Sequence, residues 1–364
     1  MPLAKVTSPD APALRELCAK LADAGAGLDQ TGRWPAEQLS WCGEAGVYRW
    51  FMDDRWGGED WSDEQTVLGY LALASACLTT TFILTQRTGA CRRIAGCTNE
   101  ALKERLLPGL ASGELFATVG ISHLTTSRRH LGRPVLTAEE TATGFRLEGL
   151  SPWVTGGGAA DVIVIAATVV ENGAATDREL LVAVPKDSPG LAAAEPLSLV
   201  GLSASSTGPV YLTGVEISPE WVIAGPAPNI MQSGLGGNAG GYETSALAIG
   251  LARAAIEFLV GESARRSEIR APLDALASEH RQLQDDLLAL VRGEAACSKE
   301  SLRQRANTFV LRATQAALSA AKGTGYVVGH PAGRWCREAL FFLVWSCPQP
   351  VAAANLCELA GILD

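Results

Sequence analysis

The sequence predicts an α+β protein of several domains, in which a helical N-terminal domain, a central antiparallel β domain and a C-terminal four-helix bundle follow one another. Apolar residues recur at helical spacing in the first and last thirds of the chain, and short β-branched runs fill the stretch between them. The length of 364 residues, with 47% hydrophobic residues, exceeds what one hydrophobic core organises, since single cores stop growing near about 250–300 residues. The expected domains are residues 1–113, 114–226 and 227–364.

The N-terminal region carries four helical patterns. Asp10 is placed to cap the first helix through its carboxylate, and Pro35 suits the first turn of the second. Ser62 is expected to begin a third, long and apolar helix. Thr98 is expected to cap a fourth helix that stops at Pro108, because proline removes a backbone donor and clashes with the preceding turn.

The middle region changes to the pattern of strands. Short runs rich in β-branched residues are divided by Gly, Pro, Asn and Asp, which favours antiparallel strands joined by turns. Because no helical pattern of about 10–15 residues lies between these runs, a doubly wound parallel sheet is disfavoured. The expected strands are Phe145–Glu148, Val162–Ala167, Leu180–Val184, Val210–Leu212 and Val215–Ile217.

The C-terminal region returns to helical spacing. Four amphipathic segments with short breaks predict a four-helix bundle, with the last segment interrupted by Pro348 and Pro350. The segments are Ala246–Leu259, Leu276–Val291, Leu302–Ala321 and Arg337–Leu359.

Composition excludes several classes of protein. The net charge of −9 disfavours a nucleic-acid partner, because an acidic chain repels phosphate backbones. The nine cysteines are scattered without a CxxC pair and the four histidines lie far apart, so no metal site is expected. The start of the chain lacks a long apolar leader, and Leu68–Leu84 carries several hydroxyl groups, which favours a buried helix over a membrane span. We therefore expect a cytoplasmic protein with reduced thiols.

Seven short motifs in one order carry a resemblance to a known family. They are Trp56–Gly58, Leu107–Glu114, Gly149–Asp161, Gly201–Thr207 followed by Val215–Pro226, Arg266–Leu273, Gly323–Tyr326 and Pro331–Ala339. Together they span nearly the whole chain and resemble the acyl-CoA dehydrogenase superfamily, whose fold has the same three parts. The resemblance implies FAD as cofactor.

The resemblance assigns a flavin ring to the β domain. Trp153 and Thr155 are two residues apart on one predicted strand, so their side chains project from the same side. In the family this pair lies at the isoalloxazine, a flat ring that needs a large side chain against one face and donors at its edge. Ser122 takes the place of a hydroxyl residue that touches the ring, and Ser127 lies near a serine that contacts the pyrophosphate.

The remaining cofactor residues come from the bundle. Arg266 matches the family arginine that reaches the FAD pyrophosphate of a neighbouring subunit, where a planar cation suits phosphate oxygens. Ile269 replaces the aromatic residue of the same motif, and Gly323 and Gly325 match a glycine motif. The resemblance therefore implies a homodimer or homotetramer.

The catalytic base departs from the family pattern. Removing the α proton of an acyl thioester needs a carboxylate, and most family members place a glutamate where this chain has Ser346. The family's other location for the base falls at Gly240, and Glu243 lies one helical turn away. His123, beside Ser122, is a second candidate because an imidazole can act as base or donor.

These residues lead to one main hypothesis and two alternatives. The main hypothesis is a FAD-dependent oxidoreductase that dehydrogenates an acyl thioester, acyl-CoA included, and passes hydride to flavin N5, with an electron-transfer partner reoxidising the flavin. The first alternative is a flavin-dependent monooxygenase on the same fold, which needs no α-proton base. The second is a catalytically degenerate homologue that acts as a binding or scaffold protein.

Overall fold

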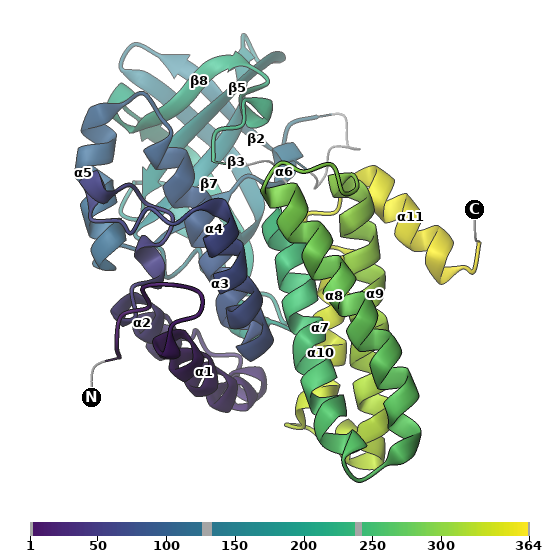
Figure 1. Ribbon diagram of the computed structural model, residues 1–364. Helices are drawn as coiled ribbons and strands as arrows, with labels where there is room; N and C mark the ends of the chain where they lie inside the picture. Colours follow the sequence, from purple (N-terminus) through teal and green to yellow (C-terminus); the bar gives the residue numbers. More distant parts are fainter. Residues whose placement is uncertain (1–2, 126–132, 237–241, 363–364) are drawn as a thin grey trace.

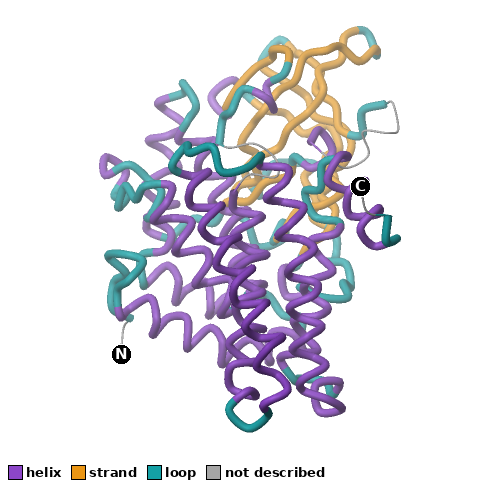
Figure 2. The backbone as a smooth tube through the Cα atoms, turned by 45° about the vertical axis from the view of Figure 1, so that its right-hand side comes forward, coloured by secondary structure: helices purple, strands orange, loops and turns teal. Residues whose placement is uncertain are grey.

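The computed structural model describes residues 3–125, 133–236 and 242–362. A helical N-terminal region, a central sheet and a helical C-terminal region follow one another along the chain (Figure 1), so the predicted fold class is confirmed. The strands gather at one end of the molecule and helices make up the rest (Figure 2).

Five α-helices form the N-terminal region. The start of α3 follows the prediction, because the Ser62 hydroxyl accepts a hydrogen bond from the Gln65 amide at 3.2 Å and the Gln65 side chain accepts one from the Ser62 amide at 3.0 Å. The helices are α1 (Pro12–Thr31), α2 (Ala36–Glu44), α3 (Asp63–Ala76), α4 (Leu78–Ala95) and α5 (Glu100–Ser112).

Three predicted helix ends differ from the structure. Asp10 does not cap α1, whose N-cap is Ala11 without a side-chain hydrogen bond. The cap of α5 is Asn99, one residue after the predicted Thr98, and its side chain accepts from the Leu102 amide at 3.1 Å. The expected stop at Pro108 is wrong: α5 continues to Ser112, because burial of leucines on both sides of the proline offsets the lost backbone bond.

The central strands form one sheet. Its order is β6–β7–β3–β2–β4–β5–β8, and β1 also pairs with β4. The sheet is mostly antiparallel, but β1 and β2 each run parallel to β4, which corrects the purely antiparallel expectation. Long connections separate these pairs in sequence, and such connections allow parallel pairing. The strands are β1 (Ala117–Gly120), β2 (Leu136–Thr141), β3 (Gly144–Thr155), β4 (Val162–Glu171), β5 (Ala174–Pro185), β6 (Leu191–Ala193), β7 (Thr207–Ile217) and β8 (Val222–Pro228). The two runs expected as separate strands at 210–212 and 215–217 are parts of β7.

The C-terminal helices match three of the four predicted segments. They are α7 (Tyr242–Ser263), α8 (Arg270–Val291) and α9 (Lys299–Ala321). The fourth segment is broken into α10 (Pro331–Ala339), the 3-10 helix η9 (Leu340–Leu343) and α11 (Gln349–Leu359). Ser346, in the break, has a φ of 43°, in the left-handed region, so a continuous helix cannot pass through it.

Helices α3 and α4 lie between the sheet and the bundle. α3 packs along α7 (Figure 1), and α4 contacts both β1 and α7. Within the described residues, α7 alone is long and apolar enough to cross a membrane, but 72% of its apolar window is buried inside the protein, as for the core helix of a bundle. A cavity lies at the junction of the sheet, α4 and α7.

Candidate active site at the junction of sheet and helices

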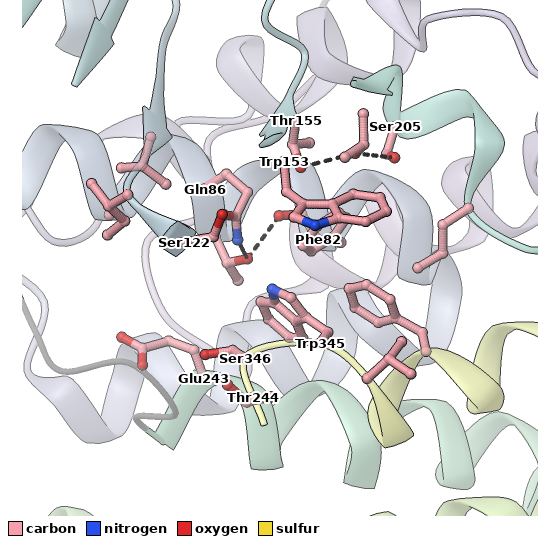
Figure 3. A pocket seen from close by; sticks show the side chains of 18 of the residues that line it. Phe82, Gln86, Ser122, Trp153, Thr155, Ser205, Glu243, Thr244, Trp345 and Ser346 are labelled. Atoms are coloured by element: carbon pink, nitrogen blue, oxygen red, sulfur yellow. Dashed lines mark hydrogen bonds between the residues drawn. The ribbon is translucent and has the colours of Figure 1, made fainter. Parts of the chain in front are cut away.

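A cavity of about 610 Å³ opens between the sheet and the helices (Figure 3). Trp153 and Thr155 line it from β3, α4 lines it from Phe82 to Arg93, and α7 contributes Glu243. Its volume lies within the range of roughly 300–1,000 Å³ that is typical of small-molecule sites.

The sheet wall of the cavity is built by an irregularity in β3. The register between β3 and β7 shifts between Ser151 and Val154, so β3 carries one extra residue there. Trp153 lies at this bulge and remains 46% exposed, although indoles are usually buried. Trp153 and Thr155 both line the cavity, as the spacing of two residues predicts.

Hydrogen bonds fix the orientation of Thr155. Its hydroxyl lies 3.0 Å from that of Thr207, which in turn lies 2.8 Å from the Ser205 hydroxyl. The Thr118 hydroxyl donates to the Thr155 carbonyl at 2.7 Å. Because Thr155, Thr207 and Ser205 all line the cavity, this wall presents a pre-organised row of hydroxyl groups.

Ser122 and His123 lie in the short helix α6 (Ser122–Thr125) and point to different sides. Ser122 lines the cavity, and among the described residues its buried hydroxyl oxygen has no hydrogen-bond partner. His123 does not line the cavity; it is 4% exposed, and its Nε2 lies 2.8 Å from the Ala166 carbonyl oxygen. Burial lowers the pKa of His123 to about 4, so the ring is neutral at pH 7. The geometry therefore does not support His123 as a base in this cavity.

Glu243 lies in the first turn of α7, on the opposite wall from Trp153 (Figure 3). Its Oε1 accepts a hydrogen bond from Arg92 Nη1 at 2.7 Å, and Arg92 Nη2 also lies 3.3 Å from Asp63 Oδ1. Each charge suits its helix end, since the carboxylates lie at the N-termini of α7 and α3 and the cation near the C-terminus of α4. Glu243 is the only carboxylate among the described lining residues.

Three aromatic rings close the other end of the cavity. The Phe341 and Trp345 rings stack with centroids 4.8 Å apart, and Phe82 packs edge-on against both at 4.7 and 5.0 Å. Phe82 lies near the start of α4 and Arg92 near its end, so this one helix lines both the aromatic and the charged end.

Ser346 follows Trp345 and also lines the cavity (Figure 3). The sequence places Ser346 where most family members have the catalytic glutamate. The structure thus presents a hydroxyl group there, and the nearest candidate for a base is Glu243 on the neighbouring helix.

The other predicted cofactor residues do not line this cavity. Arg266 Nη1 donates to the Ala320 carbonyl at 2.5 Å, and its guanidinium also pairs with Glu262 and Glu268 at 3.4 and 3.0 Å. Ile269 is 7% exposed and packs into the main core.

The two predicted glycines differ in their surroundings. Gly323 faces open space, whereas a Cβ at Gly325 would lie 2.6 Å from that of Ala321. Arg266, Ile269 and these glycines group at the end of the bundle where α7 and α9 finish. Ser127 lies outside the described residues.

Sequence reasoning missed Arg92 and the aromatic end of the cavity. Arg92 and Arg93 stand side by side in a helix that is otherwise mostly apolar and hydroxylic, and this was the available signal. The sequence carried no signal for Phe341 and Trp345, because a continuous helix was predicted there and the turn that brings their rings together was not. In the described part of the chain, no cluster of His, Cys, Asp or Glu could hold a metal ion.

Comparisons with known proteins agree with this architecture. The family model for the acyl-CoA dehydrogenase N-terminal domain matches residues 12–114. The probable acyl-CoA dehydrogenase YngJ of Bacillus subtilis is 23% identical over 329 residues, covering 86% of this chain and 86% of that protein. The solved structure of butyryl-CoA dehydrogenase from Megasphaera elsdenii aligns with a TM-score of 0.83 at 17% identity, covering 95% of this chain and 97% of that one. That of the prolyl acyl carrier protein oxidase AnaB aligns with a TM-score of 0.80 at 17% identity, covering 96% and 99%.

The protein consists of N-terminal helices, a sheet and a helical bundle, with a cavity of small-molecule size where the three meet. Residues 12–114 match the acyl-CoA dehydrogenase N-terminal domain, and nearly the whole chain is similar to acyl-CoA dehydrogenases in sequence and fold.

The cavity residues fit the flavin that this family implies. Trp153 lines the cavity and is 46% exposed, the Ser122 hydroxyl lacks a partner among the described residues, and Thr155 is held in place beside them. A flat ring with polar edge atoms needs such a combination of an aromatic face and nearby hydroxyl groups.

Proposed function

We propose that this protein is a FAD-dependent oxidoreductase that dehydrogenates an acyl thioester. The observation that carries the proposal is the cavity itself, in which the aromatic and hydroxyl groups of β3 face Glu243 on α7, the one carboxylate among the described lining residues. The names of the relatives support an acyl-CoA or carrier-bound acyl group as substrate.

The chain supplies binding, orientation and one proton acceptor. Trp153 and Thr155 would hold the ring against the sheet, and Ser122 would donate to its edge. When bound, the flavin supplies a two-electron acceptor that takes hydride from the β-carbon of the acyl group. Glu243 would take the α proton, so that the substrate loses one hydrogen as a proton and one as hydride.

The ion pair with Arg92 bears on the role of Glu243. In the structure Glu243 Oε1 is held 2.7 Å from the guanidinium, at the edge of the cavity. Proton abstraction requires the carboxylate to reach the substrate from this position at the edge of the cavity. Ser346 and Thr244 line the cavity beside it and offer hydroxyl groups that can orient a substrate carbonyl.

The FAD proposal includes a second subunit. Arg266, Ile269, Gly323 and Gly325 lie outside the cavity, which supports the arrangement implied by the family, in which these residues bind the cofactor of a neighbouring subunit. Tyr326, directly after the glycines, is 87% exposed, as expected for a residue that another subunit covers. We accordingly propose a homodimer or homotetramer, with an electron-transfer protein as partner.

The absorption spectrum and flavin bleaching test this function. Purified protein is expected to show flavin absorption, and an acyl-CoA is expected to bleach it without oxygen. Glu243→Gln should retain the absorption and lose the bleaching, whereas Glu257→Gln, on the same helix but away from the cavity, should keep both. Bleaching at an unchanged rate in Glu243→Gln would refute the assignment of the base. Protein that stays colourless with added FAD would favour a binding or scaffold role.

One observation favours a second function. Ser346 stands at the usual position of the base, and Glu243 is engaged by Arg92, which suits chemistry that needs no α-proton base. A flavin-dependent monooxygenase is such a chemistry. Oxygen uptake with externally supplied reduced flavin, together with no bleaching by any acyl-CoA, would establish it.

A further inference from the structure

The charged groups of the cavity are mostly cations. Its described lining includes Arg92, Arg93 and Arg337 but one carboxylate, Glu243. The whole chain, in contrast, carries a net charge of −9. A concentration of guanidinium groups in a cavity of an acidic protein raises the local concentration of anionic ligands.

Arg92 lines the cavity, and its guanidinium is paired with a carboxylate, that of Glu243, which also lines the cavity. The Arg92 side chain is 23% exposed and donates to Glu243, a partly exposed carboxylate at the start of α7. The second partner, Asp63, lies outside the cavity and is 72% exposed, and exposed ion pairs contribute little to stability. The position of Glu243 shows that a carboxylate oxygen can approach this guanidinium from the cavity side.

Arg93 adds a second cation to the same end. It is 6% exposed, and its Nη1 donates to the carbonyl oxygens of Gly89 at 2.8 Å and Gly236 at 3.4 Å. Burial lowers the pKa of Arg93 to about 10, while the charge of Glu243 opposes this shift. Arg93 therefore stays charged at neutral pH, and a buried cation is stabilised further by any anion that enters the cavity.

Arg337 lies apart from this end. It is paired with Asp29, which is not a lining residue, so its charge is already matched outside the cavity. The cations that remain on the lining are Arg92 and Arg93, and Glu243 is the described lining carboxylate that faces them.

We propose that Arg92, with Arg93 beside it, is an anion-binding subsite for a carboxylate or phosphate group of the substrate, which takes the place of the Glu243 carboxylate. A guanidinium matches either group through two parallel N–H donors. This inference rests on the proposed function, since it gives the chemical class of the substrate for the same cavity. Exchange of the partners also frees Glu243 from Arg92 once the substrate has bound.

A purely structural role for the pair makes opposite predictions. If Arg92 only ties α3, α4 and α7 together, removal of Glu243 lowers stability and leaves anion binding unchanged. If Glu243 occupies an anion site, its removal strengthens anion binding. The sign of the effect of one substitution therefore separates the two roles.

The test is calorimetric titration of the flavin-loaded protein with two probes, glutarate and inorganic phosphate. Arg92→Gln should weaken binding of the preferred probe by about tenfold or more, which corresponds to ~1.4 kcal/mol. Arg92→Lys should weaken binding less, because lysine keeps the positive charge and loses only the two parallel N–H donors of the guanidinium. Glu243→Gln should tighten it. Asp63→Asn, which removes the partner outside the cavity, is the control and should leave the affinity within about twofold.

Each outcome has a defined meaning. Tighter binding of glutarate identifies an acyl group that ends in a carboxylate, and tighter binding of phosphate identifies the phosphate of the thioester carrier. Binding that persists in Arg92→Gln, weaker binding in Glu243→Gln, or no binding of either probe to the wild type would overturn the proposal. The titration needs no turnover, so a failure of acyl-CoA to bleach the flavin counts against the proposed dehydrogenation and leaves the anion test intact.

Discussion

Two glycines of α7 allow a matched test of how the bundle is held against α3. Gly250 lies where the two helices cross: a Cβ built there would lie 2.7 Å from the Leu71 carbonyl oxygen and 2.8 Å from the Ala74 Cβ. Gly261, in the same helix, has nothing within 4 Å of a built Cβ. Alanine at the two positions therefore adds the same methyl group to a closed and an open environment.

Gly250→Ala should destabilise the protein by about 1–3 kcal/mol, the usual cost of overpacking a well-packed core. The obstacle is a backbone carbonyl, which cannot rotate away, so α3 and α7 must separate by roughly 0.8 Å to restore ordinary contact near 3.5 Å. Gly261→Ala should stabilise the helix by up to about 1 kcal/mol, because alanine has the higher helix propensity.

Thermal and urea unfolding followed by circular dichroism measure both effects. We expect the melting temperature to fall for Gly250→Ala and to stay level or rise for Gly261→Ala. Because α7 carries Glu243 and α3 carries Asp63, Gly250→Ala should also weaken flavin bleaching. A neutral or stabilising Gly250→Ala, or equal losses for both variants, would refute the close approach of the two helices.

Three further predictions concern single side chains. Glu338 is buried, which raises its pKa to about 7 despite Arg334 nearby. Because the folded pKa lies above the ordinary value of 4.5, folding stability should fall as pH rises from about 4.5 to about 7, and urea melts of Glu338→Gln should lack this slope. For His123 the folded pKa, about 4, lies below the ordinary 6.5, so stability should fall as pH drops through that interval, and His123→Asn should melt with less acid sensitivity. Trp153→Ala should weaken flavin binding by about tenfold and Trp153→Phe by less, as measured by quenching of flavin fluorescence; equal affinity of Trp153→Ala and wild type would contradict contact with the ring.

The sequence predicted the elements whose signals are local. The capping box at Ser62, the alternation around Trp153 and Thr155, and the long apolar helix of α7 all rest on spacing within a few residues. The predicted end of α5 was wrong because a proline inside a helix is tolerated when enough apolar side chains are buried around it. This burial depends on tertiary contacts.

The candidate site was predictable only in part, for a similar reason. Ser122 and His123 are neighbours in sequence, but in a helical turn successive side chains differ in direction by about 100°, so that one faces the cavity and the other the sheet. Arg92 and Glu243 lie on helices that are far apart in the sequence, and no local pattern relates them. Ser127 lies outside the described residues and stays a prediction, as do the roles of Arg266, Ile269, Gly323 and Gly325.

Helix α4 sets a fixed length for whatever the cavity accepts. Phe82 at one end and Arg92 at the other are separated by ten positions of continuous helix, or about 15 Å along its axis. A helix of this kind neither stretches nor shortens, so a ligand that reaches both ends must have one particular span. Because of this rigidity, the cavity would discriminate between acyl chains that differ in length by one or two carbon atoms.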